Sequence, residues 1–226
     1  MSKEVLVIGG SGDIGSSIAT LFSDNCIVKS TSRDELDLSS DKSIKSFLSL
    51  NKKKFDHVIF CAASNNLCSF KDANYSEIEQ SIKVNLLSIT EILHELIKRN
   101  FINTEGSIVI ISSLYAHFGR TKRFPYSVSK HALLGLVKNL AIELSPKKIR
   151  INSVSPGFIN TKLTRKNLSS EEIKKIEEYI PSGSIGNPID IANVVYFLCN
   201  KSSNYINGQD IVVDGGFSCG GFMGVE

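Results

Sequence analysis

The chain has 226 residues, 42% of them hydrophobic and 22% charged, and its 26 Lys and Arg against 23 Asp and Glu give a formal net charge of +3. This composition excludes a disordered or fibrous protein and suffices for one or two globular domains, of which one large domain is the expectation. The charge is too small to indicate nucleic-acid binding.

The five cysteines form no CxxC pair and have no metal-ligand spacing with the four histidines. We therefore expect free thiols and no metal site. The apolar run near the amino terminus covers only Val5 to Ile8, which is too short for a signal sequence, and no run approaches the length of about 18 residues that a membrane span needs. These features predict a soluble cytoplasmic protein without a membrane partner.

Short apolar runs alternate with helical patterns along the whole chain. The runs that are typical of buried strands are 5–8, 26–28, 58–61, 108–111, 149–154 and 211–213. Apolar residues recur at three- and four-residue steps over 78–99 and 124–144, which predicts two long helices. The alternation predicts a single α/β domain over residues 1–226, with a doubly wound parallel sheet and right-handed crossovers.

One connection is too short for this pattern. The strand that ends near Thr31 is followed almost at once by residues 35–38, which leaves no room for the dozen or more residues of a parallel crossover. We expect the crossover helix between strands 2 and 3 to be missing and the next strand to be stunted or absent. Asp41 is then expected to cap a short helix over 42–50.

A glycine-rich turn joins the first strand to the first helix. Residues 9–15 read Gly-Gly-Ser-Gly-Asp-Ile-Gly. Glycines at such a turn let the backbone approach a pyrophosphate, and the helix amino terminus supplies free N–H groups. A tight turn of any kind is the alternative, but the place directly after a strand favours dinucleotide binding. The expected cofactor contacts are Gly9, Ser11, Gly12, Asp13, Ile14 and Gly15.

The end of the second strand indicates which dinucleotide binds. It carries Ser32 and Arg33 and has no carboxylate before Asp34. An Arg here suits the 2′-phosphate of NADP, whereas an acid suits the ribose hydroxyls of NAD, so we expect NADP, with NAD as the alternative if Asp34 turns inward. Asp37 and Leu38 are placed beside the adenine, although Asp37 could equally cap a turn.

A candidate catalytic group opens the longer helix. Tyr126 and Lys130 are four residues apart and therefore share one helix face. A free Tyr has a pKa near 10, and a neighbouring ammonium would lower it toward the range needed for proton transfer at neutral pH. Ser113 lies thirteen residues before Tyr126, at the end of a strand, where its hydroxyl could hold the reacting oxygen.

From Glu4 to Phe217, these motifs resemble the short-chain dehydrogenase/reductase family, whose members have a Rossmann fold. The resemblance identifies Ser113, Tyr126 and Lys130 as a catalytic triad. It also identifies Asn85 as the helix residue that holds a water in the proton relay. The implied reaction is hydride transfer between nicotinamide and a secondary alcohol or ketone, in which Lys130 also binds the nicotinamide ribose.

The resemblance also implies cofactor contacts, with some departures. The glycine loop is similar to TGxxxGxG, but Asp13 stands where the middle glycine is usual. The family's NNAG is replaced by small residues without the amides. Residues that would face the cofactor in these segments and around the nicotinamide are Cys61, Ala62, Ala63, Pro156, Gly157, Ile159 and Thr161, together with Asn85, Tyr126 and Lys130.

Six cations flank segments that border the substrate cleft in this family: Arg120, Lys122, Arg123, Lys162, Arg165 and Lys166. They indicate an anionic substrate, such as an acidic or nucleotide-linked sugar or a carrier-bound 3-oxoacyl group, unless they form an ordinary solvated surface. Tyr115 and His117 could hydrogen-bond a polar substrate, although His117 could equally be a surface residue. The polar stretch over about 161–187, with Ser169 capping a helix, is expected to form a lid or a fixed interaction surface.

The resemblance leaves two other functions open. The chain could be a non-catalytic NADP-binding sensor or scaffold subunit, or a hydride-shuttling epimerase. Family members often form dimers or tetramers through the two long helices, so a homodimer or homotetramer is expected.

Overall fold

The computed structural model describes residues 2–220 and 223; the remaining residues of the domain predicted over 1–226 lie outside this range. Six strands form one parallel sheet in the order β2-β1-β3-β4-β5-β6. Their bounds are β1 (Lys3–Ile8), β2 (Cys26–Thr31), β3 (Phe55–Phe60), β4 (Ile102–Ile111), β5 (Arg150–Pro156) and β6 (Asp210–Val213). The predicted α/β parallel fold is confirmed, and each predicted strand is present.

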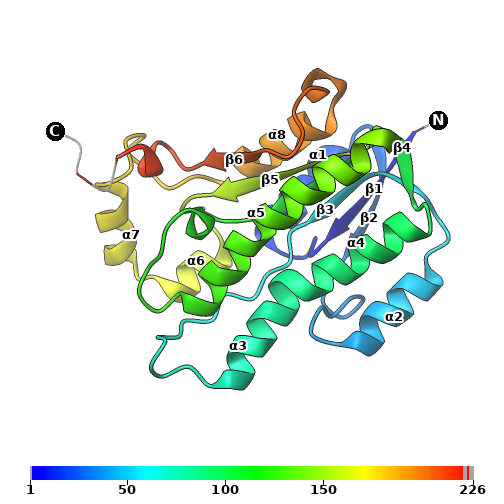
Figure 1. Cartoon of the computed structure of the whole chain (residues 1–226). Helices are drawn as coiled ribbons and strands as arrows, with labels where there is room; N and C mark the ends of the chain where they lie inside the picture. The colour runs from blue at the N-terminus through cyan, green and yellow to red at the C-terminus, as the bar shows by residue number, and fades with distance from the viewer. Residues whose placement is uncertain (1, 221–222, 224–226) are drawn as a thin grey trace.

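The helices cover both faces of the sheet (Figure 1). Their bounds are α1 (Asp13–Ser23), α2 (Asp41–Leu50), α3 (Tyr75–Ile82), α4 (Ser88–Lys98), α5 (Phe124–Leu144), α6 (Lys162–Asn167), α7 (Ser170–Glu177) and α8 (Pro188–Cys199). One layer contains α2, α4 and α5, and the other contains α1 and α8. Within the described residues, no helix has the length and apolar character required to cross a bilayer.

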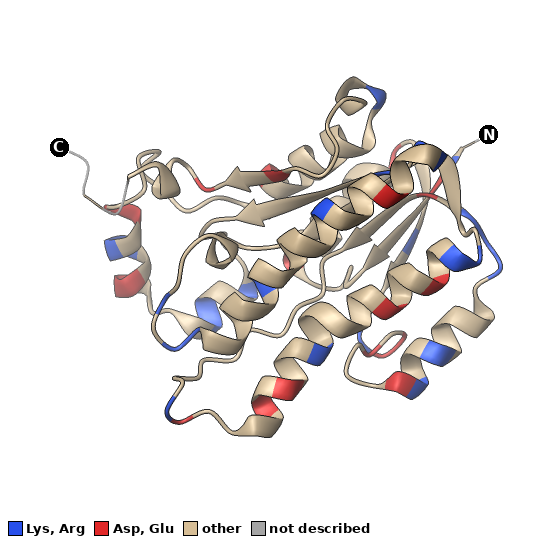
Figure 2. Cartoon of the chain, in the orientation of Figure 1, with Lys and Arg blue, Asp and Glu red and all other residues tan. Residues whose placement is uncertain are grey.

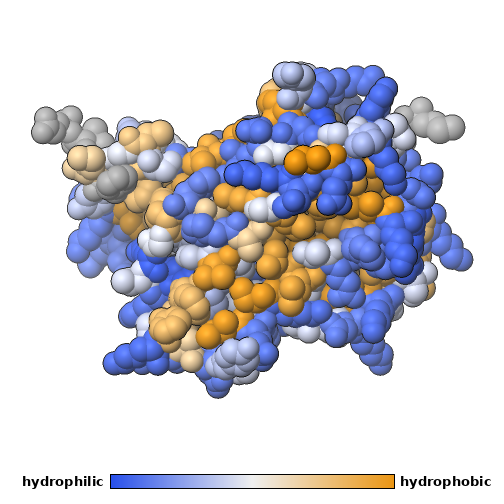
Figure 3. All heavy atoms as spheres, in the orientation of Figure 1, coloured by the Kyte–Doolittle hydropathy of each residue, from blue (hydrophilic) through white to orange (hydrophobic). Residues whose placement is uncertain are grey.

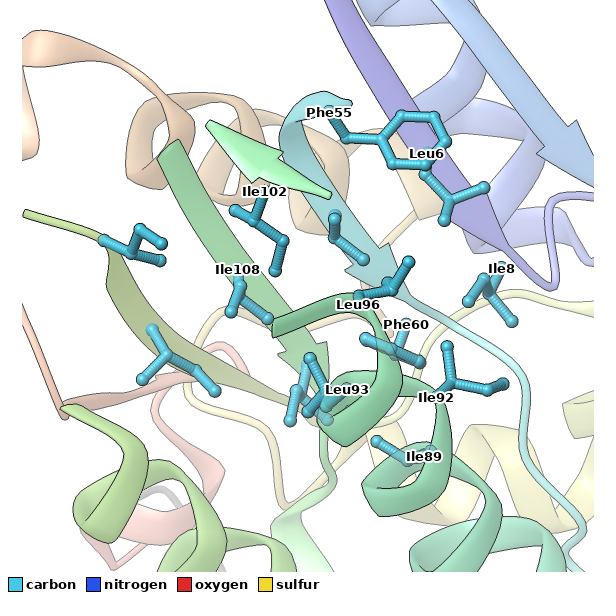
Figure 4. Packing of buried hydrophobic residues seen from close by; sticks show 14 of the residues in the cluster. Leu6, Ile8, Phe55, Phe60, Ile89, Ile92, Leu93, Leu96, Ile102 and Ile108 are labelled. Atoms are coloured by element: carbon cyan, nitrogen blue, oxygen red, sulfur yellow. The ribbon is translucent and has the colours of Figure 1, made fainter. Parts of the chain in front are cut away.

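Side chains of each strand alternate between two hydrophobic cores. Leu6 and Ile8 of β1 pack into the core beneath α2, α4 and α5, whereas Val5 and Val7 pack into the core beneath α1 and α8. Figure 4 shows the first of these cores, where side chains of the strands meet the apolar face of α4. Because both faces of the sheet are covered, its central strands β3 and β4 end in continuous apolar runs, 58–60 and 108–111, as is typical of parallel strands.

Residues 32–40, between β2 and α2, contain turns and no helix or strand, so the strand expected near residues 35–38 is absent and the sheet ends at β2. The expected loss of a crossover helix is wrong for the strands that form, because α2 connects β2 to β3. All six residues of β2 pair with β1 in register, from Lys3 opposite Cys26 to Ile8 opposite Thr31. The expected cap of α2 was wrong by one residue. Ser40 is the N-cap, since its side chain accepts a hydrogen bond from the Ser43 amide, and Asp41 is the first helical residue.

The predicted helix over 78–99 is longer and less regular than expected. It begins at Tyr75 behind a capping box in which Asn74 and Glu77 exchange hydrogen bonds. Between α3 and α4 it widens into a π-helical turn over Lys83–Leu87. Such turns occur often at functional sites, and this one contains Asn85.

The helices α6 and α7 form an excursion at the carboxyl edge of the sheet (Figure 1). A bridge between Ile159 and Gly186 joins its two ends, and the Gly186 amide donates to the Phe158 carbonyl oxygen at 2.9 Å. Ser169 caps α7 with a capping box completed by Glu172, as expected. We name residues 161–187 the lid segment.

Candidate active site

A cavity of about 170 Å³ opens at the carboxyl edge of the sheet. It is formed by the segments that follow β1, β3, β4 and β5 and by the first turns of α5, with the lid segment on the other side. This is where ligands bind in parallel α/β sheets. The lining residues that were predicted as site residues are Ile14, Cys61, Ala63, Ser113, Tyr126, Lys130, Pro156, Gly157, Ile159 and Thr161.

The predicted triad comes together in this cavity. Ser113 follows β4 and caps a short 3₁₀ turn, in which its Oγ accepts a hydrogen bond from the Tyr115 amide at 3.2 Å. Tyr126 lies in the first turn of α5, and Lys130 lies one turn later. The Lys130 Nζ is 5.5 Å from the centre of the Tyr126 ring and donates to the Ile111 carbonyl oxygen at 2.8 Å. The arrangement places a hydroxyl, a phenol and an ammonium around one space.

Burial dominates the electrostatics of this group. It raises the pKa of Tyr126 above 10.0, although the Ser113 hydroxyl and the Arg123 charge act in the opposite direction. It lowers the pKa of Lys130 to about 8. In the protein by itself, burial outweighs the groups that favour the phenolate, and the Lys130 ammonium is directed at a backbone carbonyl, so the lowering of the pKa of Tyr126 by Lys130 and the nicotinamide ring stays a prediction. At neutral pH, Tyr126 carries its proton.

Asn85 is fully buried behind the cavity. Its Oδ1 accepts from the Ser64 amide at 2.7 Å, and its Nδ2 lies within hydrogen-bond distance of the Ser64 carbonyl oxygen, Ser81 Oγ and Ser129 Oγ. The side chain thus ties the segment after β3 to α5. Both protons of the Asn85 side-chain amide have acceptors within the protein. A water beside Asn85 could therefore only donate a hydrogen bond, either to the side-chain oxygen or to the backbone carbonyl oxygen.

The glycine-rich turn has the shape of a phosphate cradle. Gly9 has a φ of +83°, and a Cβ there would lie 2.5 Å from the Ala62 amide nitrogen. A Cβ on Gly15 would collide with the Gly9 carbonyl oxygen. The N-cap of α1 is Gly12, which has no side chain to cap the helix. Among the described residues no acceptor is found for the three amides that follow it, those of Asp13, Ile14 and Gly15. This set of free N–H groups fits an anionic pyrophosphate.

Asp13, which stands where a glycine is usual in the resembled motif, reaches the lid segment. Its carboxylate accepts a hydrogen bond from the Lys162 amide at 2.6 Å, at the first residue of α6. Thr161 caps the same helix by accepting from the Thr164 amide at 3.1 Å. The glycine-rich turn and the lid segment are therefore joined by this hydrogen bond.

The end of β2 is open and polar. The Arg33 side chain is 77% exposed, and its Nε lies 3.7 Å from the Asp37 carboxylate. Asp37 also accepts hydrogen bonds from the Ser39 amide and hydroxyl. It therefore caps a turn, which was the alternative to a contact with the adenine. Leu38 packs in the core and its carbonyl accepts from Ser88, which leaves only its backbone N–H for a cofactor.

Sequence reasoning missed one acid at this end. The Glu35 carboxylate accepts from the Ser32 amide at 2.7 Å, and this bond holds the pKa of Glu35 below its ordinary value. The signal was present, because Ser-x-x-Glu is the spacing of a capping box. It also missed several lining residues that come from the segment after β3, the segment after β5 and the lid segment: Asn65, Phe158, Leu163, Thr164, Asn167 and Leu168. Their positions depend on the tertiary fold, so no local pattern marks them.

Only one of the six predicted cations lines the cavity. Arg123 is 6% exposed, whereas Arg120, Lys122, Lys162, Arg165 and Lys166 are exposed. Figure 2 shows the cations of the loop before α5 and of α6. Tyr115 is buried and lines the cavity. His117 does not line it, since its Nε2 lies 2.7 Å from the Asp210 carboxylate.

No group of three or more His, Cys, Asp or Glu side chains within the described part of the chain could hold a metal ion. The five cysteines are free thiols. Cys61 lines the cavity, and burial raises the pKa of its thiol to about 12, so it is protonated at neutral pH.

Comparisons with known proteins identify the family and the fold. A family model described as enoyl-(acyl carrier protein) reductase matches residues 13–218. The 3-oxoacyl-[acyl-carrier-protein] reductase FabG of Aquifex aeolicus is 34% identical over 216 residues, which cover 94% of this chain and 86% of that protein. The FabG of Rickettsia bellii is 33% identical over 234 residues, which cover 95% of this chain and 96% of that protein.

Two solved structures are similar over almost the whole chain. A short chain dehydrogenase family protein from Francisella tularensis has a TM-score of 0.89 and 26% identity, covering 97% of this chain and 100% of that one. The aldohexose dehydrogenase of Thermoplasma acidophilum has a TM-score of 0.89 and 28% identity, covering 96% of this chain and 94% of that one.

Proposed function

The chain belongs to the short-chain dehydrogenase/reductase family and is an oxidoreductase of secondary alcohols and ketones, and we propose that it reduces the ketone of an oxoacyl substrate with NADPH. The observation that carries this proposal is the buried Tyr126 beside Ser113 and Lys130. Its raised pKa keeps the phenol protonated at neutral pH, which is the form that a general acid needs for reduction.

The cofactor would lie along the carboxyl edge of the sheet. Its pyrophosphate would accept from the free amides of Asp13, Ile14 and Gly15. The nicotinamide end would lie against residues 156–161, which line the same cavity as Tyr126. When bound, NADPH supplies the hydride that the carbonyl carbon receives.

The protein supplies the proton and positions the substrate. Ser113 Oγ donates a hydrogen bond to the carbonyl oxygen and holds it beside the phenol. Tyr126 Oη then gives its proton to that oxygen as the carbon is reduced. Lys130, with its pKa near 8, carries an ammonium at neutral pH that stabilises the resulting phenolate and binds the nicotinamide ribose. We assign to Asn85 the positioning of α5 against the segment after β3, with a relay water held at its oxygen atoms.

We propose NADPH as the physiological reductant because of Arg33. Arg33 lies two residues after the carboxyl end of β2, within the turn-rich segment 32–40, and its side chain is exposed to a ligand there. An Arg at this place suits a 2′-phosphate. Its partner Asp37 is held in a turn by Ser39, so the guanidinium can leave the 3.7 Å contact at little cost.

The substrate is proposed from the relatives and from the cavity. Two relatives that match nearly the whole chain are named 3-oxoacyl-[acyl-carrier-protein] reductase. The family model is described as an enoyl reductase, but Tyr126 and Ser113 converge on a place suited to a carbonyl oxygen. The structural relative named aldohexose dehydrogenase makes a sugar the second candidate.

The test is NADPH oxidation by the purified protein with a panel of three substrate classes. The panel contains acetoacetyl substrates, the matching crotonyl substrates and an oxidised or acidic sugar. We expect reduction of the acetoacetyl group and none of the crotonyl double bond. If only the crotonyl group or only the sugar is reduced, the proposed oxoacyl substrate is wrong. If the protein binds the cofactor but reduces no member of the panel, the result supports the alternative of a non-catalytic sensor.

We propose that the lid segment closes the substrate side of the cavity and that the rest of the chain forms one cofactor-binding domain. Leu163, Thr164, Asn167 and Leu168 line the cavity from the lid segment. Its two ends meet at the bridge between 159 and 186, so the segment can move as a unit. We therefore keep residues 161–187 as the bounds of the proposed lid.

We also propose a homo-oligomer formed through α4 and α5. Figure 3 shows apolar side chains gathered on the face that these helices present. Exposed large apolar residues of α5 and of the turn before α4 include Ile142 at 76%, Val128 at 47% and Leu87 at 52%. Apolar area of this kind is typical of obligate interfaces. Light scattering should give a dimer or tetramer for the wild type and a smaller species for Ile142→Glu.

A further inference from the structure

A buried arginine in the wall of the cavity has no acidic partner. Arg123 is the N-cap of α5, three residues before Tyr126, and it is 6% exposed. Within the described residues none of the ion pairs includes its guanidinium. A buried charge without an opposite charge is unfavourable, so such groups are generally paired.

The neutral contacts of Arg123 hold the guanidinium in place and leave most of its donors free. Its Nη1 donates to the Asn65 Oδ1, and its guanidinium carbon lies 5.6 Å from the centre of the Tyr115 ring. Arginine has five N–H donors, and Asn65 is the one acceptor found for them in the described part of the chain. Asn65, Tyr115 and Arg123 line the same cavity as Ser113 and Tyr126.

A second cation increases the positive potential at this wall. The Arg120 Nη1 donates to Tyr115 Oη at 2.8 Å, so the two arginines contact the same aromatic residue. Burial and the charge of Arg120 both lower the pKa of Arg123, while the nearby phenols raise it. The charge of Arg120 lowers the pKa of Glu172, but the ion pairs of the described residues do not include these two. The wall therefore presents uncompensated positive charge to a ligand.

We infer that Arg123 is a specificity-determining residue that binds a free carboxylate of the substrate, so that the substrate is a short oxo acid whose carboxylate lies near the reacting ketone. This inference rests on the proposed function, since it concerns the substrate of the same site. A carboxylate matches the planar fork of a guanidinium and removes the cost of its burial. A thioester carbonyl is neutral and offers only one acceptor atom.

A different role for Arg123 would be to act through Tyr126, whose pKa its charge lowers. The two roles differ in a measurable way. An effect through the phenol changes the reduction of every ketone by the same factor. Binding of a carboxylate changes the reduction of an acid and spares that of its neutral ester.

The experiment compares three forms of one oxoacyl group: acetoacetate, ethyl acetoacetate and the acetoacetyl thioester of N-acetylcysteamine. Arg123→Gln is measured beside Arg123→Lys and the control Lys122→Gln, which removes the neighbouring exposed charge. For acetoacetate, we expect Arg123→Gln to lower kcat/KM by at least about tenfold, the scale of a charged hydrogen bond. The two neutral forms should change by less than about twofold, Arg123→Lys should keep part of the activity, and Lys122→Gln should keep nearly all of it.

Equal losses for the acid and the neutral forms, or no loss at all, would overturn the inference. Binding of acetoacetate by calorimetry in the presence of NADP⁺ separates it from the proposed function. If the wild type binds acetoacetate and Arg123→Gln does not, the carboxylate site stands even if no ketone is reduced, and only the proposed function fails. If neither protein binds it, or both bind it equally, the inference is wrong.

Discussion

The Lys130 ammonium lies 5.5 Å from the centre of the Tyr126 ring, and both side chains are buried at the start of the same helix. Burial makes each charged form unfavourable, so the pKa of the phenol is raised and that of the ammonium is lowered to about 8. The resting pair at neutral pH is a protonated phenol beside an ammonium. This pair is ready to deliver a proton to a ketone.

Replacing the phenol tests its role as the acid. Tyr126→Phe should retain affinity for NADPH, because the ring remains, but should lose at least about a hundredfold in kcat, the scale of general acid catalysis. Cofactor fluorescence gives the affinity, and NADPH oxidation gives the rate. Near-normal turnover would remove Tyr126 from the mechanism.

The pH dependence of reduction should reflect Lys130. Its pKa lies near 8, so the ammonium is present below that pH and is lost above it. We expect kcat/KM for the ketone at saturating NADPH to fall as the pH rises through about 8. In Lys130→Arg the cation persists at high pH, so the decline should move upward, whatever the absolute rate. An unchanged midpoint would assign the decline to another group.

Cofactor preference should depend on Arg33. Arg33→Ala should reduce the ratio of kcat/KM for NADPH to that for NADH by at least about tenfold, since a charge-assisted hydrogen bond to the 2′-phosphate is lost. Lys42→Ala serves as the control, because it removes an exposed charge from the first turn of α2. If both variants change the ratio equally, the effect is general electrostatics and Arg33 does not bind the phosphate.

The contact between Asp13 and the lid segment can be measured by hydrogen exchange. In Asp13→Ala the Lys162 amide loses its acceptor, and we expect its exchange to become about tenfold faster, the scale of one charged hydrogen bond. The Thr164 amide, which Thr161 holds, should change less. Unaltered exchange at Lys162 would show that the bond does not hold the lid segment.

Stability should fall in mild acid because of His57. This residue is 3% exposed, accepts a hydrogen bond from Lys3 Nζ on its Nε2 and has Ser107 Oγ at 3.0 Å from its Nδ1. Since Lys3 can only donate, the ring is neutral, and burial lowers its pKa from 6.5 to about 4. Between these values the unfolded chain binds the proton and the folded chain does not, so stability decreases as the pH falls.

The magnitude can be checked by denaturant unfolding at two pH values. From pH 7.5 to pH 5, the wild type should lose about 2 kcal/mol more unfolding free energy than His57→Gln, as the linkage of one such group requires. Equal losses in the two proteins would show that His57 is not the responsible group.

The periodicity of the sequence was sufficient for the architecture. The helix predicted over 124–144 has these bounds in the structure, since its apolar face is continuous and Pro125 opens its first turn. The strands were also found, but the apolar pattern could not give their ends. β4 begins at Ile102, before a polar stretch that no apolar run marks, and its first residue is placed in the strand by pairing with Phe55 of β3. The N-cap at Ser40 was missed because Asp41 and Ser40 are both good caps and only the backbone turn selects between them.

The site was predictable where residue types at fixed spacing define the chemistry, as for Ser113, Tyr126 and Lys130. It was not predictable where tertiary packing decides. Nothing in the sequence distinguishes Arg123 from the other five cations near the cleft. The fold buries Arg123 in the cavity wall and leaves the other five exposed. The same holds for His117, whose pairing with Asp210 joins positions 93 residues apart.

Transfer of deuterium from NADPH labelled at C4 of the reduced ring tests most directly whether the protein reduces an oxoacyl ketone with Tyr126 as the acid. With an acetoacetyl substrate, we expect a 3-hydroxyacyl product that carries the label on its carbinol carbon, formed by the wild type and not detectably by Tyr126→Phe. Tight binding of NADPH without transfer of label to any ketone of the panel would contradict it.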